Sequence, residues 1–183
     1  MSVKVTFLRG VNMAGHCKMK MTDLLSIYKK LGFKDAVTYI QSGNVVFTST
    51  ENEKKIATVI EKAILKKFGY SVPVMVRTED EIQRINQLNP YIHERDFDAG
   101  KSSVIFLYNE PDSDQVAKVS DINYPPDRFK IIGREIFIYC PNGFGRTKLY
   151  TNFFENKMKV TGTARNWKTI AAITEIASGF KEK

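Results

Sequence analysis

A β-hairpin is predicted by the stretch VTYIQSGNVVFTS, residues 37–49. Its flanks, Val37–Gln41 and Asn44–Ser49, are rich in β-branched and aromatic residues, which favour strands. Ser42–Gly43 lies between them and is typical of a turn, because glycine adopts backbone angles that other residues avoid. The stretch therefore predicts two neighbouring antiparallel strands.

Strands and helices on either side of this hairpin complete a recognisable order. Apolar runs predict one strand at residues 3–8 and another at 72–77. Apolar residues at helical spacing predict helices over residues 24–31 and 56–64, with glycine after each. The first 77 residues therefore follow the order βαββαβ, which is the ferredoxin-like arrangement.

The second half of the chain predicts a weaker version of the same pattern. A strand at residues 103–108 and a weak helix at 112–121 precede a hairpin of residues 128–140. Two helices near residues 148–158 and 164–178 follow, which gives a related β-α-β-β-α-α unit. We therefore predict an α+β protein of two subdomains. Its segments are residues 1–77 (ferredoxin-like), 78–101 (helix and linker) and 102–183 (second subdomain with C-terminal helices).

Charge is distributed unevenly along the 183 residues, whose net charge is +8. Residues 1–77 carry a net charge of +8, residues 78–127 carry −7 and residues 128–183 carry +7. Basic segments of this kind attract anionic ligands or hold an acidic segment of the same chain. No apolar run approaches the roughly 18 residues of a membrane span. Two distant cysteines and no signal-peptide core predict a cytoplasmic protein that does not associate with membranes.

The loop of residues 9–20 is the first candidate for ligand binding. It joins a predicted strand to a predicted helix and contains glycines, which let a ligand approach the backbone closely. Arg9, Lys18 and Lys20 supply positive charge, and the Asn12 amide either orients a ligand or closes the turn. A purely structural crossover turn is the alternative.

A second glycine-rich loop, residues 143–148, follows a predicted strand and is expected to open a helix. Free N–H groups at a helix start attract anions, and Arg146 and Lys148 add positive charge. The spacing of a Walker A motif is absent. Thr147 acting as a simple helix cap is the alternative.

Four further residues complete the candidate ligand-binding set. Thr163 is expected to cap the last helix, which places Arg165 and Asn166 in its first turn. A cation there opposes the helix dipole, so Arg165 is expected to have an anionic partner. Gln41 and Asn44 belong to the predicted hairpin turn, where a structural role is sufficient for Asn44 but less so for Gln41.

Catalytic and metal-binding motifs are missing from the sequence. The two histidines, His16 and His93, lack the spacing of metal ligands, and no nucleophile elbow or HExxH motif is present. We therefore expect no metal and no cofactor, and whether the protein is an enzyme stays open at this stage.

Several ordered motifs resemble the bacterial family known as domain of unknown function 1697. They are LRGVNMAG (residues 8–15), KMKM (18–21), LGF (31–33), TYIQSGNVVF (38–47), PNGFGRTKL (141–149), NFFE (152–155) and TARNWKT (163–169). The resemblance covers nearly the whole chain. It implies a soluble cytoplasmic bacterial protein with two α+β lobes, and it implies no established activity.

Three functions fit the sequence. The first is a module that binds a phosphate-bearing ligand, either a nucleotide or single-stranded nucleic acid, in a basic cleft between the lobes. The second is a small-molecule enzyme of unknown reaction that uses arginine and amide side chains for electrostatic stabilisation. The third is a structural or protein-interaction module in which basic lobes clamp the acidic middle segment. The oligomeric state is not predicted.

Overall fold

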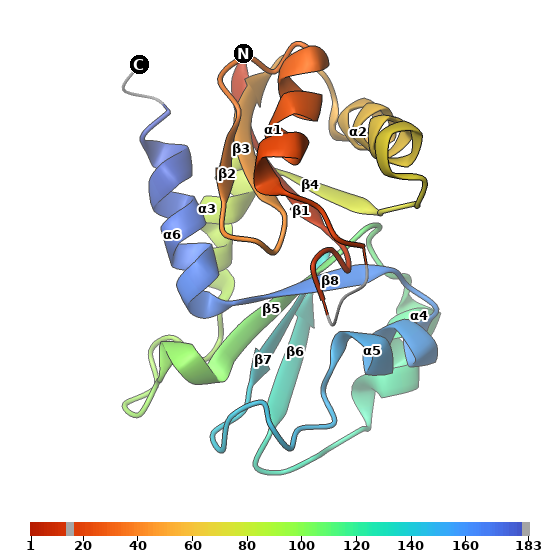
Figure 1. Ribbon diagram of the computed structural model, residues 1–183. Coiled ribbons are helices and arrows are strands. Elements are labelled where there is room, and N and C mark those ends of the chain that lie inside the picture. The colour runs from red at the N-terminus through yellow and green to blue at the C-terminus, as the bar shows by residue number, and fades with distance from the viewer. Residues whose placement is uncertain (14–16, 181–183) are drawn as a thin grey trace. The chain divides into compact units, whose positions relative to one another are not determined.

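A computed structural model describes residues 1–13 and 17–180 of the chain (Figure 1). The chain divides into two compact units, each described on its own below. Unit 1 comprises Met1–Gln83 together with Ala172–Lys183, and unit 2 comprises Arg84–Ala171. No helix within the described ranges combines the length and the apolar character needed to cross a membrane.

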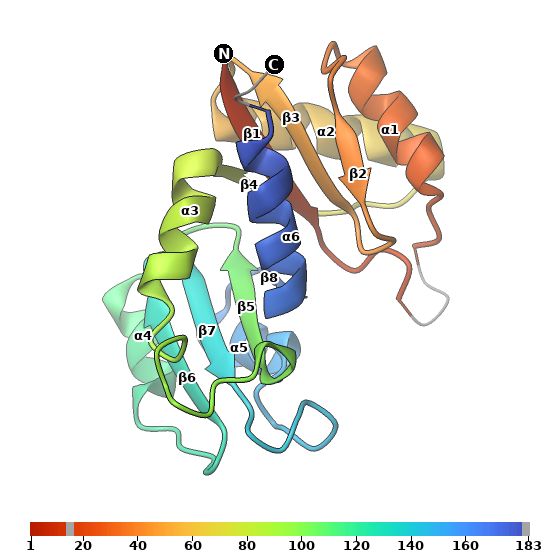
Figure 2. The same ribbon diagram turned by 90° about the vertical axis from the view of Figure 1, so that its left-hand side faces the viewer.

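Unit 1 contains a four-stranded antiparallel sheet with two helices on one face (Figure 2). The strand order is β2-β3-β1-β4, so β1 is central and pairs with both β3 and β4. The elements in chain order are β1 (Ser2–Leu8), α1 (Met21–Lys30), β2 (Val37–Tyr39), β3 (Asn44–Ser49), α2 (Glu53–Phe68) and β4 (Val74–Thr78), and α3 (Glu79–Leu88) begins at the end of this unit. This is the predicted βαββαβ order.

The core of unit 1 lies between the helices and the sheet. Ile27 of α1 and Ile60 of α2 are buried against Phe47 and Val76 of the sheet. The Tyr28 ring contacts Phe47 edge-on at 5.3 Å between centroids, and its hydroxyl hydrogen-bonds the Thr6 hydroxyl at 2.7 Å. Successive side chains of a strand point to opposite faces of the sheet, so only alternate residues of β1 face the two helices.

Unit 2 repeats the strand order of unit 1. Its antiparallel sheet has the order β6-β7-β5-β8, in which β5 pairs with both β7 and β8. The elements in chain order are η1 (Ala99–Lys101), β5 (Ser102–Leu107), α4 (Ser113–Ser120), β6 (Arg128–Ile132), β7 (Glu135–Tyr139), α5 (Thr151–Met158) and β8 (Gly162–Asn166), and α6 (Trp167–Ser178) begins at its end. The predicted fold class, α+β in two related subdomains, is confirmed; the exact segment boundaries stay a prediction.

Two local expectations for the second half were wrong. Residues 162–166 form strand β8 rather than the start of a helix, so Thr163 is a strand residue and α6 begins only at Trp167. The loop 143–148 does not open a helix, because α5 begins at Thr151 and the Thr147 hydroxyl accepts a hydrogen bond from the Leu149 N–H at 3.0 Å. The second unit therefore has the order βαββαβ as well.

Candidate functional site

The Asn12 amide fastens the loop of residues 9–20 to the neighbouring hairpin turn in unit 1. Its Nδ2 donates to the carbonyl oxygens of Met19 and Gln41, both at 2.8 Å, and its Oδ1 accepts from the Met19 N–H at 2.8 Å. Asn12 itself has a φ of +56°, a conformation that asparagine tolerates better than most residues. The amide therefore closes the loop, which is one of the two roles expected for it.

The hairpin turn beside this loop is held by a buried asparagine. Asn44 Nδ2 donates to the Tyr39 carbonyl and to the Ser42 hydroxyl, both at 2.9 Å. Gly43, with a φ of +74°, accepts at its carbonyl from the Leu8 N–H at 2.9 Å. Gln41 is exposed beside them, and its backbone carbonyl is the acceptor for Asn12. The structure thus brings the 9–20 loop and the hairpin turn together within unit 1.

The three cations of the 9–20 loop differ in exposure. Lys18 and Lys20 are exposed, whereas Arg9 is half-buried and its backbone N–H donates to the Pro73 carbonyl at 3.0 Å. The Lys18 carbonyl accepts from the Tyr70 hydroxyl at 2.7 Å, so the segment that follows α2 also holds the backbone of the loop. His16, which lacks the spacing of a metal ligand in the sequence, lies outside the described residues.

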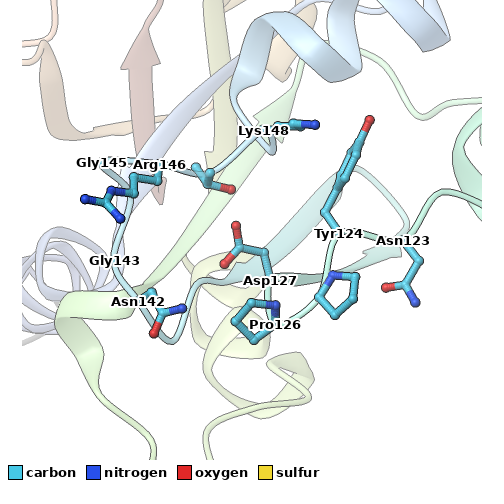
Figure 3. Close-up of a pocket in the computed structure, with 11 residues that line it drawn as sticks. Asn123, Tyr124, Pro126, Asp127, Asn142, Gly143, Gly145, Arg146 and Lys148 are labelled. Carbon is cyan, nitrogen blue, oxygen red and sulfur yellow. The ribbon is translucent and has the colours of Figure 1, made fainter.

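Arg146 and Lys148 line a hollow in unit 2, which has a volume of 610 Å³. One wall is the connection from α4 to β6, residues 123–127, and the other is the connection from β7 to α5, residues 142–148. In Figure 3 the Asp127 carboxylate lies between the two connections, and the Arg146 guanidinium points away from it. We call this site the unit 2 hollow.

Both walls of the unit 2 hollow are held by hydrogen bonds within the unit. The Asp127 N–H donates to the Tyr124 carbonyl at 2.8 Å, which closes a tight turn. The Gly143 N–H donates to the Cys140 carbonyl at 2.8 Å, and the Tyr150 hydroxyl donates to the Phe144 carbonyl at 2.7 Å. The connection that carries Arg146 and Lys148 is therefore held at both ends.

Cys140 lies buried beside the two walls of the hollow. Burial raises the pKa of its thiol to about 11; the Thr147 hydroxyl opposes this shift by hydrogen bonding, and the Asp127 carboxylate adds to it. The thiol therefore stays protonated at neutral pH and is a poor nucleophile. At the rim, Lys148 Nζ lies 5.1 Å from the centroid of the Tyr124 ring, a cation–π contact.

Arg165 and Asn166 lie at the end of β8, outside the residues that line the hollow. The Asn166 Oδ1 accepts from the Thr169 N–H at 2.8 Å and so caps α6. Arg165 is only 6% exposed, and its Nη1 donates to the Thr163 hydroxyl and the Ala164 carbonyl, both at 2.8 Å. Burial lowers its pKa to about 10, so the side chain remains a cation at neutral pH. Because it belongs to a strand, the expectation of a first-turn cation was wrong.

Unit 1 contains a counterpart of Arg165 that the sequence did not single out. Arg77 of β4 is fully buried, and its Nη1 donates to the carbonyl of the preceding residue, Val76, at 2.9 Å. Arg77 is paired with Val5 of the central strand β1, as Arg165 is paired with Val104 of the central strand β5. The two arginines therefore occupy equivalent positions of the repeated sheet, which indicates a shared structural role.

The model of the family described as "Protein of unknown function (DUF1697)" matches residues 1–137. The chain belongs to this family. The matched range ends before the PNGFGRTKL and TARNWKT motifs, which contributed to the resemblance noted above. A search of curated proteins found no match.

A solved structure of a bacterial protein has the same fold as this chain. It is the conserved bacterial protein SP0830 from Streptococcus pneumoniae, with a TM-score of 0.73 and 21% sequence identity. The match covers 96% of this chain and 98% of the other. At this identity the similarity establishes the fold alone.

Sequence reasoning found only part of each candidate site. Six of the expected residues belong to unit 1: Arg9, Asn12, Lys18, Lys20, Gln41 and Asn44. Four belong to unit 2: Arg146, Lys148, Arg165 and Asn166. Convergence of the two sets stays a prediction. Asp127 and Tyr124 of the hollow were missed, although their position before the predicted hairpin 128–140 was a usable signal.

Proposed function

We propose that the unit 2 hollow binds a small phosphate-bearing molecule of nucleotide size. The observation that carries this proposal is a hollow of 610 Å³ whose lining includes two exposed cations, Arg146 and Lys148, and one carboxylate, Asp127. Ligand sites for small molecules have volumes of roughly 300–1,000 Å³. Arginine suits the planar, bidentate recognition of phosphate, and lysine adds a point charge.

The Asp127 carboxylate adds a second requirement for the ligand, which is a hydrogen-bond donor. Asp127 repels a phosphate but accepts hydrogen bonds from hydroxyl or amino groups. A ligand that places its phosphate near Arg146 or Lys148 and its sugar or base near Asp127 would bind both walls of the hollow. The Tyr124 ring, which Lys148 Nζ also contacts, lines the same hollow, and the Asn123 and Asn142 amides add donors and acceptors. A nucleoside monophosphate has these features.

Isothermal titration of the full chain with AMP, ribose 5-phosphate and inorganic phosphate tests the proposal. We expect AMP to bind best, and we expect the double variant Arg146→Gln/Lys148→Gln to weaken AMP binding at least tenfold. Lys118→Gln/Lys157→Gln is the matched control, because these two exposed lysines belong to the same unit, remove the same charge and do not line the hollow. Equal weakening by the control, or no binding of AMP at low salt, would refute the proposal.

A second variant tests the contribution of Asp127 separately from that of Arg146 and Lys148. Asp127→Asn removes the negative charge and keeps the size of the side chain. We expect this variant to bind inorganic phosphate more tightly and to lose part of its preference for AMP, because repulsion of the phosphate falls and the hydroxyl acceptor is weaker. An unchanged ratio of the two affinities would show that Asp127 does not contact the ligand.

A further inference from the structure

The outer surface of the α1 and α2 helices in unit 1 is rich in lysine. The two helices lie on one face of the sheet (Figure 2), and their apolar residues are buried in the core of the unit. Asp23 of α1 pairs with Lys67 of α2 at 2.8 Å, which places the start of α1 beside the end of α2. We call the following exposed residues the lysine face: Lys29, Lys30, Lys54, Lys62 and Lys66.

The five lysines of the lysine face outnumber the two acids of α2, Glu53 and Glu61, and three other acids of the unit are bonded elsewhere. Asp23 is bonded to Lys67 and Glu51 to Lys55, while the Asp35 carboxylate accepts from Thr48. Within the part of the chain that the structure describes, the five residues of the lysine face form no ion pair.

The lysines recur at helical spacing along the two helices. Lys62 and Lys66 are four residues apart, which places them on one side of α2, on successive turns. Lys30 is seven residues after Asp23, so it lies on the same side of α1 as the carboxylate that reaches α2. The charges therefore form an extended surface rather than a single point, and a repeating anion such as a phosphate backbone is complementary to it.

The other side chains of the two helices indicate which polyanion fits. None of the large hydrophobic residues exposed on the described part of α1 and α2 is aromatic, so the surface offers no platform on which unpaired bases stack. Leu65 is the one such residue there, which is too little apolar surface for insertion into a membrane interface. We propose that the lysine face binds the backbone of double-stranded nucleic acid without sequence specificity.

Fluorescence anisotropy with labelled DNA and RNA duplexes of random sequence, titrated with the full chain, tests this proposal. The logarithm of the binding constant is measured against the logarithm of salt concentration between about 50 and 200 mM. The test variant is Lys30→Gln/Lys62→Gln/Lys66→Gln. The matched control is Lys118→Gln/Lys130→Gln/Lys157→Gln, which changes the net charge equally at exposed lysines of unit 2.

We expect the test variant to reduce the magnitude of the salt slope by about 0.9 for each lysine that contacts a phosphate of B-DNA, and the control to leave the slope unchanged. The DNA and RNA arms show which duplex is preferred. Equal losses in both variants would mean that net charge alone drives binding, and the proposal would fail. It would also fail if no duplex bound at low salt, or if phosphatidylserine vesicles bound and duplexes did not.

Discussion

Replacing Asn12 with aspartate tests how the 9–20 loop is held. The substitution preserves the size of the side chain, and aspartate tolerates the φ of +56° almost as well as asparagine. It keeps the oxygen that accepts from the Met19 N–H but removes the Nδ2 that donates to the Met19 and Gln41 carbonyls at 2.8 Å. In the variant, a carboxylate oxygen faces two carbonyl oxygens in place of a donor.

The magnitude follows from the bonds that are lost. Each of the two hydrogen bonds contributes about 0.5–1 kcal/mol, because the site is partly open to water and the freed carbonyls are rehydrated. The variant should therefore lose about 1–2 kcal/mol of unfolding free energy at pH 7. For a chain of this length, that corresponds to a fall in Tm of about 2–8 °C, measured by circular dichroism and by urea unfolding.

The pH dependence of Asn12→Asp has a definite sign. Two facing carbonyl oxygens disfavour the charged carboxylate, so the folded protein raises the pKa of Asp at this position above its unfolded value. Lowering the pH through that raised pKa protonates the carboxyl group and restores one donor, so the defect shrinks in acid relative to the unsubstituted protein.

Asn52→Asp is the matched control for this substitution. The Asn52 side chain caps α2 by accepting from the Lys55 N–H at 2.9 Å, and an aspartate accepts there equally well. We expect the control to unfold like the original chain at pH 7. Superimposable unfolding curves for Asn12→Asp and the original chain, or an equal loss in Asn52→Asp, would show that the amide does not hold the loop.

Two further predictions concern one glycine and one thiol. Gly43→Ala should destabilise the protein by about 1–3 kcal/mol more than Gly32→Ala in urea unfolding. Both positions have positive φ, but only at Gly43 would the added Cβ lie 2.7 Å from a Val11 methyl group. Similar losses in the two variants would contradict this packing. The pKa of about 11 leaves about one in a thousand Cys140 thiols ionised at pH 8, and the side chain is buried. Iodoacetamide should therefore modify Cys140 rapidly only in urea, as measured by mass spectrometry. Rapid modification of the folded protein would contradict the burial of Cys140.

Local signals explain why most of the fold was predictable. The helix α2 ends at Phe68 and is followed by Gly69, whose φ of +80° is typical of a helix C-terminus, and the β2–β3 turn contains Gly43. In contrast, β8 has the sequence GTARN, without the alternating apolar residues that identify a strand. Pairing of β8 with the buried strand β5 determines its conformation, and such a long-range effect is not visible in a local pattern.

The unit 2 hollow was half predictable for a similar reason. Arg146 and Lys148 were identified because charge and glycine occur together in one short stretch. Asp127 comes from a different connection and reaches the hollow through the β6–β7 pairing, in which Arg128 lies opposite Tyr139. That register places the residue before β6 beside the residue after β7, Cys140. The hairpin was predicted, so extending its register by one residue at the open end would have joined the two walls.

The two units share a scaffold but differ in their connections. In unit 1 the connection from β3 to α2 is residues 50–52, whereas the equivalent connection in unit 2, from β7 to α5, is residues 140–150. Three residues are thus enough to join this strand to this helix in the same strand order. Connectivity alone therefore does not require the additional residues of unit 2, and these residues include Arg146 and Lys148. Long loops on a rigid scaffold commonly carry binding residues. This difference between the repeats is independent of charge, and it supports the unit 2 hollow as a site to test.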